Sequence, residues 1–180
     1  MPPLFRRRPT RDRQQGAPSH GTTTSTGQHS SKHVLLVGSS GGHLAQLLVL
    51  RPWWECRQRT WVSFETPDAF SQLEGEHVHW AHFPTTRNLP NLLRNLVLAL
   101  RVMRRTRPDV VVSTGAGVAL PFFIWAKLMG VPTVFVEVYD RVDSRTLTAR
   151  LCRPLTDRFL VQWESQQALY QGSHLIGRLM

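Results

Sequence analysis

Segment 34–44 reads Val34-Leu35-Leu36-Val37-Gly38-Ser39-Ser40-Gly41-Gly42-His43-Leu44, and it joins an apolar run to a glycine-rich turn. The apolar run is typical of a strand buried in a sheet, and the residues after the glycines favour a helix. Glycines let the backbone turn sharply or approach a ligand closely. The amides of such a loop, with the positive end of the following helix, form a site for an anion. We therefore predict a phosphate-binding loop made by Gly38, Ser39, Ser40, Gly41 and Gly42, with the titratable His43 beside it. The alternative is a tight turn with a surface histidine.

Short apolar runs alternate with longer amphipathic segments along the chain from His33 onward. The short runs are rich in β-branched and aromatic residues, and they predict strands at 33–37, 60–64, 77–82, 109–113, 132–137 and 158–162. Helices are predicted at 43–51, 67–74, 90–106, 117–129, 144–152 and 164–170. This alternation indicates parallel strands joined by right-handed crossovers. We therefore expect an α/β fold, a Rossmann-like parallel sheet with helices on both faces, whose ligands bind beyond the carboxyl ends of the strands.

Positive charge is concentrated at the amino terminus. Residues 1–32 hold six of the 22 basic residues and one of the 12 acidic ones, and therefore half of the net charge of +10. This segment has few large apolar side chains and cannot bury enough surface to offset the entropy of ordering. We predict a disordered basic tail at 1–32, which is either a solvated extension or a weak tether to anionic lipid. A single domain is predicted at 33–180.

Several kinds of partner are disfavoured by the sequence. No helix-turn-helix, zinc-finger or base-stacking pattern accompanies the basic charge, so nucleic acid is not expected. Cys56 and Cys152 have no metal-ligand spacing and fit a reducing cytoplasm. No apolar run is long enough to span a bilayer, and no signal peptide is present, so any membrane contact is expected to be peripheral. Segment 90–106 carries leucines at helical spacing and arginines at its far end, which predicts either a core helix or one that partly faces lipid.

A second glycine-rich loop follows the strand predicted at 109–113, and it reads Ser113-Thr114-Gly115-Ala116-Gly117. The carboxyl ends of parallel strands share one edge of a sheet, so we expect this loop to complete a divided anion site with the first one. Arg87 is predicted to add a bidentate phosphate contact. Asn88, next to it, is predicted to cap the helix at 90–106.

Glu137 ends a predicted strand and opens a segment rich in carboxylates, arginines and hydroxyls. Desolvation at the end of a buried strand would raise the pKa of its carboxyl group into the range of a general base. The alternative is a solvated loop held by salt bridges, with Ser144 capping the next helix.

The first loop differs from the common nucleotide-binding motifs. A dinucleotide fingerprint requires glycine where the sequence has Ser40 and His43, and the Gly-Lys-Ser/Thr of a P-loop is absent. Glu65 does end the second predicted strand, where a dinucleotide-binding domain has its ribose-binding acid. A dinucleotide-binding oxidoreductase domain is therefore kept as an alternative.

In their order, these motifs resemble the PssD/CpsF group of bacterial polysaccharide-biosynthesis proteins, from His33 to the last residue. That group is similar to the membrane-recruiting subunit of the eukaryotic UDP-GlcNAc transferase of dolichol-linked glycan assembly. It is also similar to the amino-terminal, acceptor-side half of MurG-like GT-B glycosyltransferases. The motifs are Gly-Ser-Ser-Gly-Gly-His-Leu (38–44), Pro-Thr-Thr-Arg-Asn (84–88), Ser-Thr-Gly-Ala-Gly-Val (113–118), Glu-Val-Tyr-Asp-Arg-Val (137–142) and Leu-Val-Gln-Trp-Glu (160–164).

The resemblance implies the acceptor-binding subunit of a two-chain glycosyltransferase that is inactive without its partner. A PssE-like chain would bind most of the UDP-sugar donor, and this chain would need neither cofactor nor metal. The pair would transfer a sugar, with inversion, to a polyprenyl-pyrophosphate-linked saccharide in exopolysaccharide or capsule synthesis. The sequence ends at 177–180, where the donor half of a GT-B enzyme would begin. It has no counterpart of the eukaryotic subunit's membrane helix, so a cytoplasmic protein in peripheral contact with the inner face of the plasma membrane is expected.

The resemblance also assigns roles to particular residues. Gly41, Gly42 and the 113–117 loop would contact the acceptor phosphate. His43 would act as the general base or orient it, and Glu137 is the second choice for that role. A different alternative is a non-catalytic scaffold that recruits or enhances a glycosyltransferase.

Overall fold

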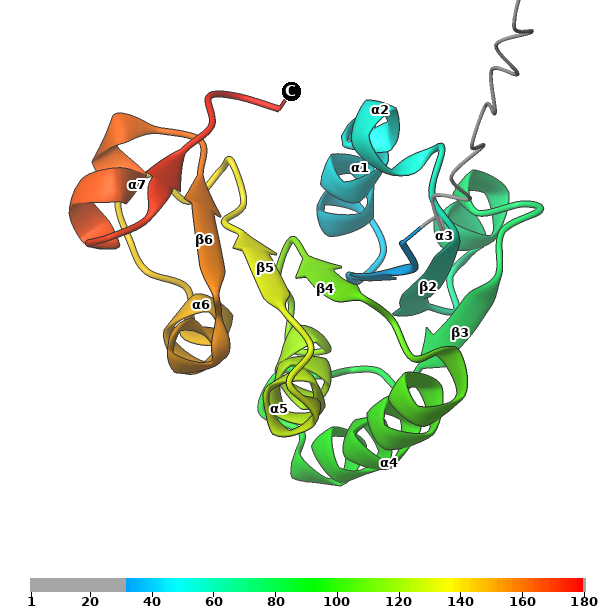
Figure 1. The fold of residues 1–180 in the computed structure, drawn as a ribbon. Helices are drawn as coiled ribbons and strands as arrows, with labels where there is room; N and C mark the ends of the chain where they lie inside the picture. Colours follow the sequence, from blue (N-terminus) through cyan, green and yellow to red (C-terminus); the bar gives the residue numbers. More distant parts are fainter. Residues whose placement is uncertain (1–31, 180) are drawn as a thin grey trace, which may run out of the picture.

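Seven parallel strands form one sheet within residues 32–179, the part of the chain that the computed structural model describes. Their order across the sheet is β3-β2-β1-β4-β5-β6-β7 (Figure 1). The strands are β1 (Val34–Val37), β2 (Arg59–Phe64), β3 (Val78–Ala81), β4 (Val110–Ser113), β5 (Thr133–Val136), β6 (Arg158–Val161) and β7 (His174–Leu175). The first six lie within one residue of the predicted strands, whereas the two-residue β7 is too short for a sequence pattern to predict. The tail predicted at 1–32 lies outside the described residues, apart from Lys32.

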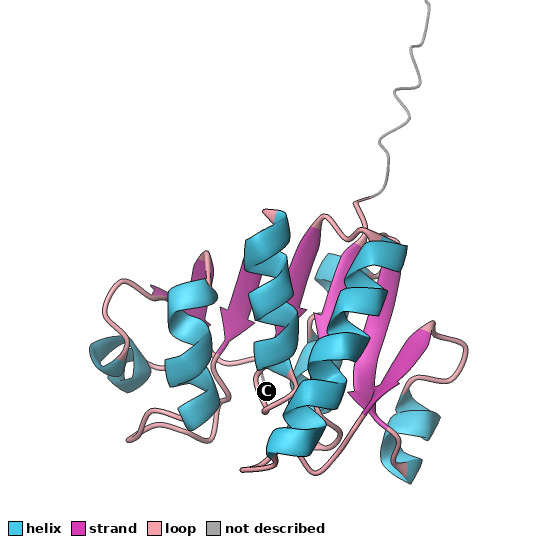
Figure 2. Ribbon diagram, turned by 90° about the horizontal axis from the view of Figure 1, so that it is seen from below, coloured by secondary structure: helices cyan, strands magenta, loops and turns pink. Residues whose placement is uncertain are grey.

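Helices cover both faces of the sheet, which confirms the predicted fold class. The helices are α1 (Gly42–Val49), α2 (Arg51–Trp54), α3 (Pro67–Gln72), α4 (Leu89–Thr106), α5 (Ala119–Met129), α6 (Leu147–Cys152) and α7 (Glu164–Leu169), with a 3-10 turn, η1 (Arg153–Leu155), directly after α6. One face carries α4, α5 and α6, and the opposite face carries α1 and α2 (Figure 1). Seen from the side of α4 and α5, the helices lie next to one another across the strands (Figure 2).

The alternation of side chains in β1 divides the core between the two faces. Leu35 and Val37 belong to a cluster with the buried sides of α4, α5 and α6. Val34 and Leu36 belong to a second cluster with α1, α2 and α3. All four side chains are fully buried, because successive residues of a central parallel strand face covered sides of the sheet. The apolar run at 34–37 is therefore explained by burial on both faces.

The direction of strand order reverses at β1, which pairs with β2 on one side and with β4 on the other. The chain consequently leaves β1 toward one face of the sheet and leaves β4 toward the other. At such a reversal the two connecting loops diverge and leave a crevice at the carboxyl ends of the strands. The loops at this position are the two glycine-rich segments, 38–42 and 113–117.

Two of the predicted helix starts depended on capping residues, and the outcomes differ. Asn88 caps α4 as predicted, since its Oδ1 accepts a hydrogen bond of 3.0 Å from the Asn91 amide. The prediction that Ser144 caps the next helix is wrong. Thr146 has this role, because its Oγ1 accepts from the Ala149 amide at 3.1 Å and α6 begins at Leu147.

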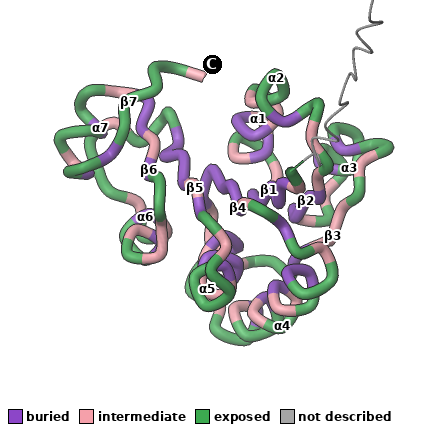
Figure 3. Tube along the Cα trace, viewed as in Figure 1, coloured by how far each residue is buried: buried purple, intermediate pink, exposed green. Residues whose placement is uncertain are grey.

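The apolar stripe of α4 is only partly used by the core. Its buried side includes Asn95, which exchanges hydrogen bonds of 2.8 and 2.9 Å with the backbone of His82. The outer side leaves Leu89 64%, Leu93 57% and Val97 49% exposed. Figure 3 shows this contrast between the buried central strands and the exposed outer turns of α4. Within residues 32–179, no helix combines the length and the apolar character that crossing a bilayer requires.

Candidate functional site

His43 joins the two glycine-rich loops through two hydrogen bonds. Its ring Nδ1 lies 2.8 Å from the carbonyl oxygen of Thr114. In return, the Oγ1 hydroxyl of Thr114 donates to the carbonyl oxygen of His43 at 2.7 Å. The loops predicted to lie side by side are therefore in direct contact, although 71 positions separate these residues in the sequence.

The contact with Thr114 fixes the tautomer of the neutral His43 ring. A carbonyl oxygen only accepts, so Nδ1 carries the hydrogen and, in the neutral ring, Nε2 keeps its lone pair. Burial lowers the pKa of His43 from its ordinary value of 6.5, and this effect outweighs the opposite effects of the Thr114 contact and of Asp140. The ring is therefore neutral near pH 7, with Nε2 able to accept a proton. No residue in the described part of the chain forms a hydrogen bond with Nε2.

Glycine is required at two positions of the second loop. Gly115 has φ +106°, and a Cβ there would lie 3.2 Å from Cε1 of His43. At Gly117, a Cβ would lie 2.8 Å from Oγ1 of Thr85. A side chain at either position would therefore force the loop apart from its neighbours. These close approaches bring the predicted loop, His43 and the segment around Thr85 into one site.

The amides of the first loop are only partly free. Gly41 has φ +67° and precedes α1 without any side-chain cap on the helix. Its own amide donates to Oδ2 of Asp68 at 2.9 Å. Hydrogen bonds from Thr66 and Gly41 lower the pKa of the Asp68 carboxyl group. The carboxylate of Asp68 already occupies part of the predicted anion site, whereas the first-turn amides of α1 from Gly42 onward have no side-chain partner.

The hydroxyl groups of Ser39, Ser113 and Thr114 form hydrogen bonds within the loops, whereas the Ser40 hydroxyl forms none with the described residues. Oγ of Ser113 is buried and accepts from the Gly115 amide at 3.0 Å. Oγ of Ser39 donates to the carbonyl of Ser40 at 3.2 Å, and the Thr114 hydroxyl is bonded to His43. These side chains shape the backbone that a ligand would meet.

Arg87 lies at a pocket of about 500 Å³ next to the second loop. We name it the leucine pocket; it is lined by Thr85, Thr86, Arg87, Asn88, Leu89, Leu92, Gly117, Leu120, Leu147, Thr148 and Leu151. Arg87 has a left-handed backbone with φ 51° and an exposed side chain. The pocket therefore combines one cation with an apolar wall from α4, α5 and α6, directly beside Gly117.

Glu137 and His43 form hydrogen bonds with different residues. The Oε1 atom of Glu137 accepts hydrogen bonds from the Val138 amide at 3.2 Å and from the Thr146 hydroxyl at 3.5 Å. Its Oε2 is buried and has no hydrogen-bond partner among the described residues. Burial raises the pKa of the Glu137 carboxyl group, against the opposing effect of the nearby Tyr170 hydroxyl. The raised pKa agrees with the sequence prediction. The environment, however, is the packing around α6, with Cys152 and Tyr170, and the described contacts include none with His43.

A buried glutamine network around the site was not predicted from the sequence. Nε2 of Gln162 donates to Oε1 of Gln46 at 2.7 Å and to the carbonyl of Glu137 at 2.9 Å. Nε2 of Gln166 donates to the carbonyls of Val138 and Arg141, the former at 2.6 Å. These bonds fix the loop that places Asp140 near His43. The position of Gln162 directly after a strand was the available signal.

Metal ligation has no support in the described residues. Within residues 32–179, no group of three histidine, cysteine or acidic side chains is placed to hold an ion. Cys56 is exposed and Cys152 is buried, and burial raises the pKa of the Cys152 thiol to about 12.

The seven-stranded parallel sheet with helices on both faces is the Rossmann-like fold that also forms one half of GT-B glycosyltransferases. The solved structure of MurG from Acinetobacter baumannii is similar, with a TM-score of 0.61 and 19% sequence identity over 74% of this chain and 42% of that one. The UDP-GlcNAc 2-epimerase of Methanocaldococcus jannaschii has the same fold, with a TM-score of 0.59 and 14% identity over 76% of this chain and 41% of that one.

The family follows from the sequence comparison. Residues 81–179, more than half of the chain, match the family "Oligosaccharide biosynthesis protein Alg14 like", and the chain belongs to it. The UDP-N-acetylglucosamine transferase subunit ALG14 of Rattus norvegicus is 27% identical over 172 residues, which cover 86% of this chain and 80% of the rat protein.

A complete transferase is also among the similar proteins. The UDP-N-acetylglucosamine--N-acetylmuramyl-(pentapeptide) pyrophosphoryl-undecaprenol N-acetylglucosamine transferase of Tolumonas auensis is 29% identical over 157 residues. The match covers 80% of this chain and 43% of that enzyme, so this chain spans less than half of its length.

Proposed function

We propose that this chain is the acceptor-binding subunit of a two-chain glycosyltransferase that transfers a sugar from a UDP-sugar to a polyprenyl-pyrophosphate-linked saccharide. The observation that carries the proposal is the His43 ring, which Thr114 holds between two glycine-rich loops and whose pKa is lowered by burial. Membership of the Alg14-like family supports the same function, since its relatives are named as subunits of a UDP-N-acetylglucosamine transferase.

In the proposed reaction, His43 is the general base. Nε2 accepts the proton of the acceptor hydroxyl while its oxygen attacks the anomeric carbon of the donor sugar. The bond from that carbon to the UDP oxygen breaks, and UDP leaves with the bonding electrons. Attack from the face opposite the leaving group inverts the anomeric configuration. The bond from Nδ1 to Thr114 stabilises the imidazolium that forms.

The acceptor diphosphate is proposed to lie at the carboxyl edge of β1 and β4. The amides at the start of α1, from Gly42 onward, offer hydrogen bonds and the positive end of a helix. Arg87 supplies a cation from the leucine pocket. The leucine wall of that pocket suits the first isoprene units of the lipid. Of the proposed phosphate contacts, Ser39, Ser113 and Thr114 act through the shape of the loops rather than by direct contact.

The donor is proposed to be bound mainly by a second, PssE-like chain, as in the PssD/CpsF systems of exopolysaccharide and capsule synthesis. The full-length MurG-type enzymes are more than twice as long as the region they share with this chain. No cofactor other than the donor is invoked.

A peripheral position at the inner face of the plasma membrane is part of the proposal. Leu89 on α4 and Leu147 and Leu151 on α6 line the leucine pocket and are exposed, and Leu93 is exposed one turn after Leu89. Exposed leucines beside a cation such as Arg87 are suited to the boundary of acyl chains and phosphate headgroups.

Reconstitution tests the proposal. The purified chain and its partner, incubated with UDP-GlcNAc and a polyprenyl-pyrophosphate-linked sugar, should give product only when both are present. His43→Ala should reduce turnover of the pair by about 10²–10⁴-fold, which is the usual contribution of general-base catalysis. The matched control is His82→Ala, because His82 is an exposed histidine on the loop after β3.

Two other experimental outcomes would favour the scaffold or the oxidoreductase alternative over this function. If the partner alone turned over at full rate, this chain would be a scaffold that only recruits it. If calorimetric titration showed tight binding of NAD(P) and none of the acceptor, the oxidoreductase alternative based on Glu65 would stand. Glu65 is exposed after β2, as that alternative requires.

A further inference from the structure

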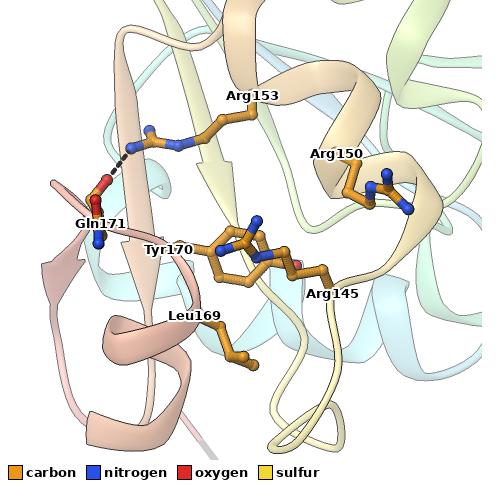
Figure 4. A pocket seen from close by; sticks show the side chains of 6 residues that line it. All are labelled: Arg145, Arg150, Arg153, Leu169, Tyr170 and Gln171. Carbon is orange, nitrogen blue, oxygen red and sulfur yellow. Dashed lines mark hydrogen bonds between the residues drawn. The ribbon is translucent and has the colours of Figure 1, made fainter.

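A second cationic pocket lies between α6 and α7, beside strand β6. We name it the arginine pocket; its volume is about 420 Å³, and it is lined by Arg145, Arg150, Arg153, Leu169, Tyr170 and Gln171. The three arginines come from the loop before α6, from α6 itself and from η1. Arg145 lies across the Tyr170 ring, Arg153 is turned toward Gln171, and Arg150 lies on the α6 side of the pocket (Figure 4). The pocket shares no lining residue with the leucine pocket or with the loops that hold His43.

No acidic residue lines this pocket, and none of its three arginines forms a salt bridge within residues 32–179. Asp143, two residues before Arg145, is exposed on the preceding loop and is not a lining residue. The salt bridges of the described residues join Arg51 to Glu55, Arg59 to Glu76 and Lys127 to Asp157. Asp157, the next acid along the chain, is bonded to the amide and hydroxyl of Thr133. Three cations that share a pocket without a carboxylate repel one another, and an anion would relieve that repulsion.

Aromatic rings and a backbone carbonyl hold two of the arginines in place. The guanidinium carbon of Arg145 lies 5.8 Å from the centre of the Tyr170 ring, and that of Arg153 lies 4.9 Å from the centre of the Phe159 ring. Arg153 also donates to the carbonyl of Gln171. The Tyr170 hydroxyl is turned inward, where it accepts from the Thr146 amide at 3.2 Å. Guanidinium groups held in this way lose less freedom when a ligand binds.

We propose that the arginine pocket is a binding site for a phosphate group, separate from the acceptor site at His43. A guanidinium donates two parallel N–H bonds, which match the oxygens of a phosphate. The same chemistry is offered by a phospholipid headgroup and by a soluble phosphate ester. The site goes beyond the proposed transferase function, and it binds its ligand whether or not the chain takes part in catalysis.

Solution NMR of the full chain separates this site from the one at the glycine loops. Inorganic phosphate is titrated into the labelled protein while the backbone amides of Tyr170, Gln171 and Gly42 are followed. The Tyr170 and Gln171 signals should shift and saturate. In Arg145→Gln/Arg150→Gln, which changes two exposed side chains and leaves the braced Arg153, the apparent Kd from these signals should weaken about tenfold or more. The variant Arg51→Gln/Arg57→Gln loses the same charge on the opposite face and should bind like the wild type.

Vesicles distinguish the two sources of the phosphate. Co-sedimentation compares phosphatidylglycerol with phosphatidylcholine vesicles for the wild type and both double variants, all with the amino-terminal tail present. Loss of phosphatidylglycerol binding only in Arg145→Gln/Arg150→Gln identifies a headgroup site. Unchanged sedimentation together with a weaker phosphate titration identifies a soluble ligand. Shifts confined to Gly42, or Tyr170 and Gln171 shifts that are equal in all three proteins, would overturn the proposal.

Discussion

Replacing Gly115 by alanine tests whether the second loop positions the His43 ring. At φ +106° this residue lies in a region that L-amino acids avoid, which costs about 1–3 kcal/mol. The new Cβ would lie 3.2 Å from Cε1 of His43 and 3.4 Å from Cζ of Phe135. Phe135 is fully buried between other aromatic rings and cannot move freely. The His43 ring must therefore give way.

The expected loss of stability is about 3 kcal/mol, which combines the backbone cost with about 1 kcal/mol for crowding in a packed interior. For a domain of this size that loss lowers Tm by about 6–12 °C. Displacement of the ring would also break the 2.8 Å bond from Nδ1 to Thr114 and change which nitrogen carries the hydrogen. Transfer by the reconstituted pair should fall by about 10²-fold, because a misplaced base loses most of its effect.

Gly130→Ala is the matched control. Gly130 ends α5 with φ +69°, and a Cβ there would have no atom within 4 Å. It therefore pays the left-handed backbone cost of about 1–2 kcal/mol without touching the site. Calorimetry gives Tm, and a radiolabelled-sugar assay gives turnover. Equal effects of the two substitutions on both readings would refute the positioning of His43 by the second loop.

Three further measurements address His43, Glu137 and Asn88. Because burial lowers the pKa of His43, the acid limb of the pH–rate profile of the pair should have its midpoint below the ordinary value of 6.5; a midpoint above 6.5 would argue against His43 as the base. Burial raises the pKa of Glu137 above 4.5, so the folded state binds the proton more tightly than the unfolded state and stability falls as pH rises above that value. Glu137→Gln should thus become more stable relative to wild type between pH 4.5 and 7 in urea unfolding, and a constant difference would contradict this. Asn88→Ala removes the cap of α4 and should cost about 1 kcal/mol in the same assay, with Asn91 left in place.

The layout of the fold could be predicted because burial on both faces leaves a clear pattern. Each short β-branched run became a strand, and each loop predicted at a carboxyl end lies there. The meeting of the two glycine-rich loops was also predictable, since strand direction alone brings carboxyl ends to one edge. The start of α6 was predicted wrongly, because Ser144 and Thr146 are both good caps and only tertiary contacts select Thr146.

The finer geometry of the site depends on contacts between distant segments. Nothing in the sequence near His43 indicates that the carbonyl of Thr114 orients its ring. Nothing near Gly41 indicates that Asp68, on another helix, binds its amide. Such contacts depend on how the helices pack on the sheet, and the spacing of apolar residues in the sequence does not predict them. The predicted role of Glu137 as a base stays a prediction, and its contacts with Thr146 and Val138 favour His43 for that role.

The Gln162 side chain links helix α1 to the residues that follow β7. Its Nε2 holds Gln46 on α1, the helix that begins with Gly42 and His43, while its Oε1 accepts from the Leu179 amide at 3.0 Å. The Gln162 carboxamide thus joins the residues that follow β7 to α1, the helix that contains the proposed base His43. We therefore expect a displacement of residues 176–179 to affect α1 through these two hydrogen bonds. A protein bound to this segment would thus influence the helix of the proposed base without contacting the glycine-rich loops.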